Sequence, residues 1–394
     1  MDFGFTPEEE RFREEVREWL EKEPPGKFKM ELEDEGYGCW GVSREFTRHL
    51  GAKGWLAPDW PVEYGGQGRT SMEKLILVME LAKHRAPTFL HFAAELVGPT
   101  IMLYGTEEQK RDFLPKMASG KTIICECMSE PDAGSDAAAI NTQAMEDGDY
   151  YIINGQKTWT SLAHLADWCW VTVLTDPSAT PRYKGISSFI IDAKTPGITI
   201  RPIINMAGEQ SFNEVFFDNV RVPKSNLLGK INNGWYQLLA ALDSERCWSR
   251  AGMAWYCGEI LKDLITYTKE TKNGGDSLNH NPLIRQKLAQ LAIDIEACRI
   301  LQYRVAWIHS RNTLPNYEAS MAKVYADELS QRLAMAGMEI LGFYGQLKRD
   351  SKWSVLKGMI GHMYVNSYGK TIAAGASEIQ RNIIAQRGLK LPRS

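Results

Sequence analysis

The spacing of apolar residues predicts helices in the first third of the chain. Behind a Thr-Pro-Glu-Glu start, apolar residues recur at helical intervals from Phe12 onward, with Thr6 placed to cap the helix and Pro7 at its first position. Residues 106–109 read Thr-Glu-Glu-Gln, a capping box that predicts a helix ending near Gly120. The same helical period predicts further helices over residues 43–51, 71–85 and 88–104.

The middle of the chain has a different pattern, with short runs rich in β-branched and aromatic residues between Gly, Pro and Asp turns. These runs are IICECMSE, DYYIING, WCWVTVLT, GISSFIID, ITIRPI and NEVFFDNVRV. The helical period then returns over residues 235–269, 283–311, 317–341 and 376–387. We therefore expect a multi-domain α+β protein: a helical domain over 1–122, a β-barrel-like domain over 123–229 and a four-helix-bundle domain over 230–394.

Composition narrows the class of protein. With 44% apolar and 24% charged residues, the 394-residue chain has the makeup of a folded globular protein. Its 46 basic and 49 acidic residues leave a net charge of −3, so nucleic acid is not an expected partner. No uncharged apolar run approaches the roughly 18 to 20 residues that span a bilayer. The acidic start lacks the basic and apolar regions of a secretory signal, and the expected location is the cytoplasm.

Several kinds of catalytic site find no support in the sequence. The seven cysteines contain no Cys-x-x-Cys pair, which argues against a disulfide framework or a structural zinc site and favours reduced, buried thiols. No His-Glu-x-x-His motif is present, so no metal is expected. Walker A, Gly-x-Gly-x-x-Gly and Gly-x-Ser-x-Gly motifs are also missing. Composition and spacing alone thus leave the chemistry open.

Six motifs in a fixed order carry a resemblance to a known family. They are GWLAPDWPVEYGG (54–66), YGTEEQK (104–110), MSEPDAGSD (128–136), INGQKTWTS (153–161), VFFDNVRVP (215–223) and SEIQR (377–381). Each is weak alone, but in this order and spacing they resemble the acyl-CoA dehydrogenase family along nearly the whole chain.

The resemblance implies a tetramer in which each subunit carries non-covalent FAD. It implies that Met128 and Ser129 line the flavin ring, and that Trp159, Thr160 and Ser161 flank it from the other strand. It places Ser135 near the thioester end of the CoA ligand, and Arg246, Ala374 and Gly375 are further expected substrate contacts.

The family reaction needs a general base, and the usual one is missing here. Most members place a catalytic Glu before a Gly, in a Glu-Gly-Thr-x-x-Ile-Gln-Arg pattern, whereas this chain reads Ala-Gly-Ala-Ser-Glu-Ile-Gln-Arg over residues 374–381. Alanine accepts no proton, and Glu378 lies four residues on. A minority of the family supplies the base from an early C-terminal-domain helix, one residue before an Arg. Glu245 followed by Arg246 matches that position. The non-catalytic alternative is that Glu245 pairs with a neighbouring arginine on a solvated helix face.

The flavin-binding motifs also depart from the family pattern. The usual Arg-x-x-Phe-Gly is replaced by Thr-Lys-Asn-Gly-Gly-Asp at 271–276. Glu339 stands where the family has Gln, with Gly342 after it. Arg285 or Lys323 is a candidate to compensate for the lost pyrophosphate contact, and a surface role is as plausible for both. His91 and Glu95, one helical turn apart, are candidates to face the acyl group, although a lone His is more often simply hydrogen-bonded.

The leading hypothesis is an FAD-dependent acyl-CoA dehydrogenase that oxidises an acyl-CoA to the 2-enoyl-CoA. The departures resemble branches that act on branched, dicarboxylic, steroid-side-chain or alicyclic acyl groups. Electrons are expected to pass to an electron-transfer flavoprotein or a similar acceptor, and the assembly is expected to be a homotetramer or a heterotetramer. Two alternatives stay open: a non-catalytic, flavin-poor subunit of a heterotetramer, and a flavin oxidase or monooxygenase on the same fold.

Overall fold

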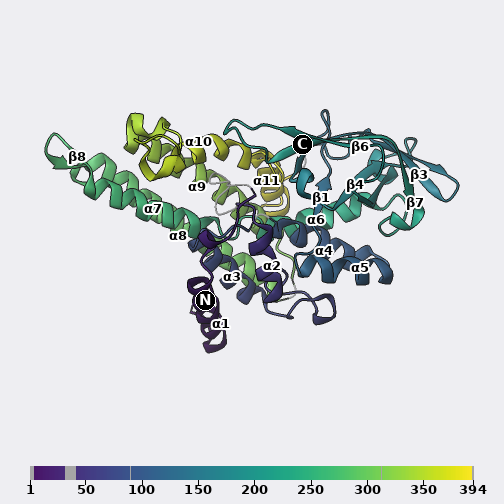
Figure 1. The fold of residues 1–394 in the computed structure, drawn as a ribbon, viewed down its shortest axis with the longest axis horizontal. Helices are drawn as coiled ribbons and strands as arrows, with labels where there is room; N and C mark the ends of the chain where they lie inside the picture. The colour runs from purple at the N-terminus through teal and green to yellow at the C-terminus, as the bar shows by residue number, and fades with distance from the viewer. Residues whose placement is uncertain (1–3, 32–40, 89, 312, 393–394) are drawn as a thin grey trace. The chain divides into compact units, whose positions relative to one another are not determined.

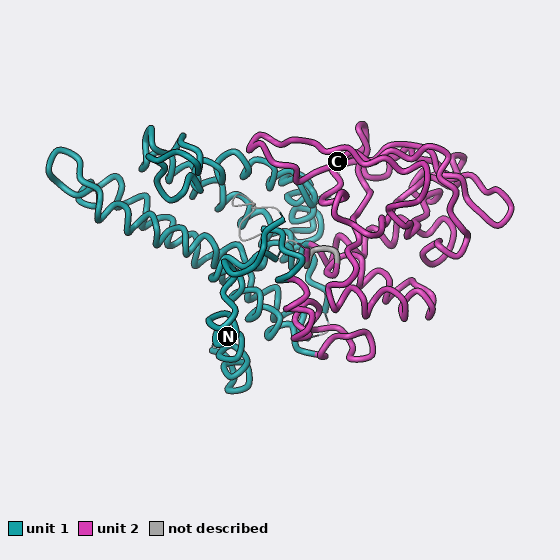
Figure 2. Tube along the Cα trace, viewed as in Figure 1, with its two compact units in different colours: residues 1–46, 69–89, 246–394 teal, residues 47–68, 90–245 magenta. Residues whose placement is uncertain are grey.

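The structure is a computed structural model that describes residues 4–31, 41–88, 90–311 and 313–392. The chain folds into two compact units (Figure 2). Unit 1 comprises residues 1–46, 69–89 and 246–394, and unit 2 comprises residues 47–68 and 90–245. The domain ranges expected from the sequence, 1–122, 123–229 and 230–394, stay a prediction. No helix in the described ranges is long and apolar enough to cross a membrane.

The first helices begin where the capping signals predict. Thr6 and Thr106 each accept a hydrogen bond from the backbone N–H three residues on, and complete capping boxes with Glu9 and Gln109. Thr70 forms a third capping box that the sequence analysis did not single out. These helices are α1 (Pro7–Lys22), α2 (Arg44–Ala52), α3 (Ser71–Lys83), α4 (His91–Tyr104) and α5 (Glu107–Ala118) (Figure 1).

Within unit 1, a buried carboxylate holds α1 against α3. Glu80 is 1% exposed and forms ion pairs with Arg13 at 2.9 Å, Arg17 at 3.1 Å and Lys83 at 3.0 Å. Burial is the largest effect on this carboxyl and opposes its ionisation, but the three cations together lower the pKa of Glu80. The apolar positions Phe12, Val16 and Leu20 of α1 are buried, as their helical spacing predicts.

The central part of the chain is a seven-stranded sheet in unit 2, which confirms the expected central β domain. Its strands are β1 (Ile124–Cys127), β2 (Gln143–Asp147), β3 (Tyr150–Ser161), β4 (Trp168–Leu174), β5 (Ile186–Asp192), β6 (Ile198–Ile203) and β7 (Phe212–Pro223). The pairing order is β1-β4-β2-β3-β7-β6, with β5 branching from β4. β2 was not predicted, because only Ala144 of its five residues is buried and the alternation is too weak to detect.

One glycine of the predicted β runs is required by the packing of the sheet. Gly155 of β3 has φ +151°, and a Cβ atom there would lie 2.5 Å from the Thr142 hydroxyl oxygen. It sits at a shift in the β3–β7 register, where the strand bulges.

The last part of the chain is helical, as expected. The helices are α6 (Gly234–Trp248), α7 (Met253–Glu270), α8 (Pro282–His309), α9 (Tyr317–Leu341), α10 (Met359–Lys370) and α11 (Ser377–Ile383). The single helix predicted over 235–269 is wrong, because the chain breaks into i→i+3 turns between α6 and α7. There, a Cβ atom on Gly252 would lie 3.0 Å from the Cβ of Ala82 on α3, so close packing selects glycine.

Helices α7 to α10 pack together within unit 1. The sequence did not predict α10. Ile360 of α10 packs so closely against Gly337 of α9 that a Cβ atom on Gly337 would lie 2.8 Å from the Ile360 side chain. The 271–276 segment that replaces the family motif forms an exposed hairpin of β8 (Lys272–Asn273) and β9 (Asp276–Ser277) between α7 and α8 (Figure 1).

Candidate active site

The ends of β1 and β3 meet at one place in unit 2. The Ser129 carbonyl accepts a hydrogen bond from the Thr158 N–H at 2.9 Å. The Lys157 ammonium, fully buried, donates to the Met128 carbonyl at 3.0 Å and pairs with Glu130 at 2.8 Å. The structure thereby brings together the two motifs, 128–136 and 153–161, that were expected to flank one ligand.

Glu130 is the anchor of this junction. Its carboxylate accepts from the backbone N–H groups of Asn141 at 2.6 Å and Thr142 at 2.9 Å. Burial opposes its ionisation, but the Lys157 charge and these hydrogen bonds lower the pKa of Glu130. Sequence reasoning did not single out either member of this ion pair, although both lie inside the quoted motifs.

A bulge in β3 turns Trp159 out of the sheet. Trp159 has φ +58°, a left-handed conformation that is rare for a large side chain, and the β3–β7 register shifts between Lys157 and Thr160. Its indole is 59% exposed and packs edge-on against Phe212 at 6.0 Å. A strained, exposed tryptophan is costly, and such outliers cluster at ligand sites.

Thr160 and Ser161, which follow Trp159 in β3, face opposite sides of the sheet. Thr160 is 1% exposed, and its hydroxyl lies 3.9 Å from the Cys127 sulfur, so its side chain belongs to the core. Its carbonyl accepts from the Asn213 amide at 3.1 Å. Ser161 is partly exposed and, by strand alternation, lies on the side of Trp159. Of the two hydroxyls, that of Ser161 is therefore the one available to a ligand.

These residues fit the flavin that the resemblance implies. An isoalloxazine needs an apolar or aromatic wall and polar groups at its edge. Trp159 and Met128 would supply the wall, while the partly exposed Ser129 and Ser161 would supply hydroxyls at the neighbouring strand ends. Ser135 is exposed in the turn after β1, where a soluble ligand can reach it.

Glu245 lies inside the protein. It belongs to α6 and is 5% exposed, so the alternative of a solvated helix face is wrong. The preceding Ser244 hydroxyl donates to the Glu95 carbonyl at 2.9 Å, which fastens α6 to α4 within unit 2. Glu95 is partly buried, and the His91 side chain lies outside the described part of the structure.

A second carboxyl, missed by sequence reasoning, lies near Glu245. Glu126 on β1 has a buried carboxylate oxygen with no hydrogen-bond partner among the described residues. Burial first, and then the negative charge of Glu245, raise the pKa of Glu126 well above its ordinary range. An acidic residue within an otherwise apolar strand was the available sequence signal.

Arg246 lies in the part of α6 that belongs to unit 1 and is partly buried. Burial, together with the like charge of Arg387, lowers the pKa of Arg246 to about 10. The guanidinium thus stays charged at neutral pH, and a poorly hydrated cation of this kind is suited to an anionic ligand.

The turn that replaces the usual base is tightly held in unit 1. Ala374 and Gly375 are left-handed, with φ +57° and +82°. Their carbonyls accept from the Gln380 amide at 3.1 and 3.3 Å, and the Lys323 ammonium donates to the Gly375 carbonyl at 2.9 Å. Lys323 is fully buried and pairs with Asp327 at 2.9 Å. Lys323 is therefore neither a surface residue nor available to a pyrophosphate.

The other expected flavin contacts lie on the surface of unit 1. Glu339 is exposed on α9 and forms an ion pair with Lys287 of α8. Gly342 is exposed and ends α9 with φ +56°. Arg285 is exposed near the start of α8. Their roles toward a cofactor stay predictions.

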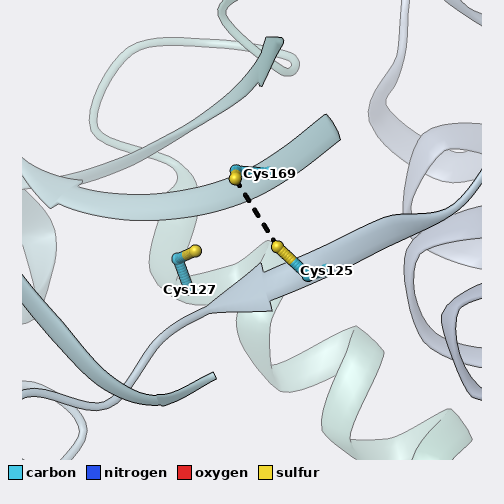
Figure 3. Close-up of side chains that lie close together, drawn as sticks. All are labelled: Cys125, Cys127 and Cys169. Carbon is cyan, nitrogen blue, oxygen red and sulfur yellow. Dashed lines mark hydrogen bonds between the residues drawn. The ribbon is translucent and has the colours of Figure 1, made fainter. Parts of the chain in front are cut away.

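Three cysteines form a buried cluster in unit 2. Cys125 and Cys127 of β1 and Cys169 of β4 have sulfur atoms within 4.8 Å of one another (Figure 3). Cys125 and Cys169 are 3.5 Å apart across the strand pair. The neighbouring thiols and burial raise the pKa of Cys125. All six cysteines of the described ranges are buried and outside disulfides, and Cys39 lies outside those ranges.

We expect this cluster to be apolar core rather than a metal site. A metal needs deprotonated thiolates, and the surrounding side chains, among them Ile153, Val171 and Phe189, are apolar. Purified protein should therefore contain less than about 0.1 zinc or copper ion per chain by mass spectrometry. Treatment with a thiophilic chelator should leave its turnover unchanged. A stoichiometric metal that is lost in the variant Cys127→Ala would contradict this expectation.

Comparison with known proteins identifies the family. Residues 6–121, 125–220 and 232–389 match the models of the acyl-CoA dehydrogenase N-terminal, middle and C-terminal domains. The chain belongs to the acyl-CoA dehydrogenase family. The protein is accordingly an oxidoreductase of the FAD-dependent acyl-CoA dehydrogenases.

Individual relatives support this membership along the full chain. Acyl-CoA dehydrogenase FadE26 of Mycobacterium tuberculosis is 36% identical, with all of both chains covered. Among solved structures, the Tcur3481-Tcur3483 steroid acyl-CoA dehydrogenase has a TM-score of 0.88 at 32% identity, again covering both chains fully. A chain of the ChsE4-ChsE5 complex from Mycobacterium tuberculosis has a TM-score of 0.87 at 34% identity and the same coverage.

Proposed function

We propose that this acyl-CoA dehydrogenase removes the α-proton of its substrate with Glu245 and forms the 2-enoyl-CoA. The observation that carries the proposal is the burial of Glu245 in the same unit as the flavin motifs, with its charge felt by Glu126, two residues before Met128. In the family's usual position, Ala374 has no group that accepts a proton.

The residues of the chain have separable roles in this proposal. Glu245 accepts the proton, and its burial limits the access of water to its carboxylate. Ser135 is the proposed thioester contact of unit 2, and Arg246 and the main chain of Ala374 and Gly375 are proposed substrate contacts of unit 1. Met128, Ser129, Trp159 and Ser161 hold the flavin ring, with Thr160 supporting them from the core. The chemistry that FAD supplies when bound is acceptance of the hydride that leaves the β-carbon.

The acyl group is proposed to be bulky or substituted, and the electron acceptor to be an electron-transfer flavoprotein. Similarity to a steroid acyl-CoA dehydrogenase and, at 32% identity, to the glutaryl-CoA dehydrogenase of Desulfococcus multivorans supports a substrate other than a plain short chain. Two of the similar structures, Tcur3481-Tcur3483 and ChsE4-ChsE5, are named as pairs of proteins. They support a heterotetramer as an alternative to a homotetramer.

The test is anaerobic flavin reduction by the purified chain with straight, branched, cyclic and dicarboxylic CoA thioesters. We expect a yellow protein with about one FAD per chain that bleaches with at least one thioester. A colourless chain that gains flavin and activity only with a partner would instead identify a non-catalytic subunit. Peroxide formed in proportion to turnover would identify an oxidase.

A further inference from the structure

Glu126 lies on the apolar face of β1 that is covered by helices. Ile124 and Met128 pack into the cluster that contains Val97 of α4 and Ala241 of α6. Cys125 and Cys127 belong to the cluster on the opposite face. Because side chains alternate along a strand, Glu126 lies on the face of Ile124 and Met128.

Glu245 faces the same interior from the helix side. It follows the buried Ala241 by four residues, and residues four apart share one face of a helix. The charge of Glu245 acts on the Glu126 carboxyl, which agrees with this placement. Both groups, and the expected flavin residue Met128, therefore border one region of unit 2.

The described surroundings of Glu126 leave its carboxyl group short of ion-pair and hydrogen-bond partners. None of the ion pairs of the described residues includes it, and the neighbouring charge of Glu245 is negative and raises its pKa further. One carboxylate oxygen is buried without a hydrogen-bond partner in the described chain, while the residue as a whole keeps partial exposure. An arrangement of this kind destabilises a fold and is usually retained for function.

We propose that Glu126 is a specificity-determining residue whose carboxyl group hydrogen-bonds to a neutral oxygen atom, a ketone or hydroxyl, on the acyl group of the substrate. The inference rests on the proposed function, because it places the acyl group beside Glu245. It narrows the substrate class to oxygen-substituted acyl-CoAs.

Two features favour a neutral oxygen over a carboxylate as the partner. A protonated carboxyl donates one hydrogen bond and accepts others, which suits both a ketone and a hydroxyl. A dicarboxylic substrate would bring a third acidic group close to Glu126 and Glu245, with no cation acting on Glu126 among the described residues. A plain alkyl chain would leave the carboxyl without a partner, and sites built for a hydroxyl reject such analogues strongly.

The experiment compares matched thioesters with the flavin-loaded protein. The probes are hexanoyl-CoA, 5-oxohexanoyl-CoA, 5-hydroxyhexanoyl-CoA and hexanedioyl-CoA, and cyclohexanecarboxyl-CoA with its 4-oxo and 4-hydroxy forms. We expect wild type to prefer an oxo or hydroxy form over its plain partner by at least about tenfold in kcat/KM. Glu126→Leu should abolish that preference and Glu126→Gln should retain part of it. The control variant Glu108→Gln, at an exposed glutamate of α5, should leave both the preference and kcat/KM unchanged.

Two further measurements separate the outcomes. Dissociation constants of the same thioesters, measured by flavin absorbance in Glu245→Gln protein with and without Glu126→Leu, report the preference without turnover. If Glu245→Gln instead turns over fully, the base assignment fails, and the kcat/KM comparison of wild type with Glu126→Leu still tests the role of Glu126. Glu126→Leu should also raise the melting temperature by a few degrees, whereas a purely structural residue would lower it.

Three results would overturn the proposal. The first is equal binding of plain and oxygenated thioesters by wild type in both series. The second is a preference for hexanedioyl-CoA. The third is loss of FAD from Glu126→Leu, which would make the residue a flavin ligand.

Discussion

Replacing Glu245 by Gln should lower the rate of flavin reduction by about 10² to 10⁴ while FAD remains bound. Gln has the shape of Glu but accepts no proton, and Glu245 is buried where water is a poor substitute base. Stopped-flow absorbance under anaerobic conditions measures the step directly. FAD content and the melting temperature show whether the variant is intact.

Two companion variants make this result specific. Glu378→Gln removes the carboxylate closest in sequence to the usual base position and should leave the rate within about twofold. Ala374→Glu in the Glu245→Gln background restores a carboxylate at that usual position and should recover part of the lost rate. Ala374 already adopts a left-handed conformation, so the added cost is small. Full activity of Glu245→Gln would remove this residue from the mechanism.

Replacing Lys157 by Met should destabilise the protein by about 3–5 kcal/mol and weaken FAD binding. The substitution leaves the Glu130 carboxylate buried with only backbone N–H partners and releases the carbonyl of Met128, a proposed flavin contact. Urea unfolding of the holoprotein and FAD fluorescence titration measure the two effects. Lys224→Met is the matched control, because its partner Glu146 and Lys224 itself are both largely exposed.

The effect of Lys157→Met should also depend on pH. The folded state lowers the pKa of Glu130, so the stabilisation is fully present above its unfolded value of about 4.3. It is lost as pH falls through the lower folded value. The difference in unfolding free energy between wild type and Lys157→Met should thus shrink below about pH 4. A difference that is constant with pH, or no larger than that of Lys224→Met, would contradict the role of the ion pair.

Local signals predicted most of the secondary structure. The capping boxes at Thr6 and Thr106 marked helix starts, because their hydrogen bonds lie within four residues of the chain. Two elements were not predicted. β2 buries only one side chain, so its alternation is weak, and α10 packs against Gly337 of α9, a residue distant from it in sequence. The break after α6 was missed for the same reason, since Gly252 packs against α3.

The family motifs named the expected flavin contacts, but the direction of each side chain needed the structure. Thr160 and Ser161 are equivalent in the motif, yet the β3 bulge turns the first inward and leaves the second beside Trp159. Lys323 was a candidate for pyrophosphate binding and proves to be a buried anchor of the Gly375 turn.

The order of apolar and polar residues, with the family motifs, determined on its own the α, β, α plan and the acyl-CoA dehydrogenase family, and it led to the prediction of Glu245 as the base. Only the tertiary structure decided that Glu245 is buried and that Lys157 and Glu130 join β1 to β3. It also showed that one carboxylate oxygen of Glu126 has no hydrogen-bond partner among the described residues and that a second carboxyl lies nearby. The physical reason is that burial and electrostatic coupling depend on residues that are distant in sequence. Glu126 and Glu245 are more than a hundred positions apart, and no local sequence pattern predicts that they lie close together.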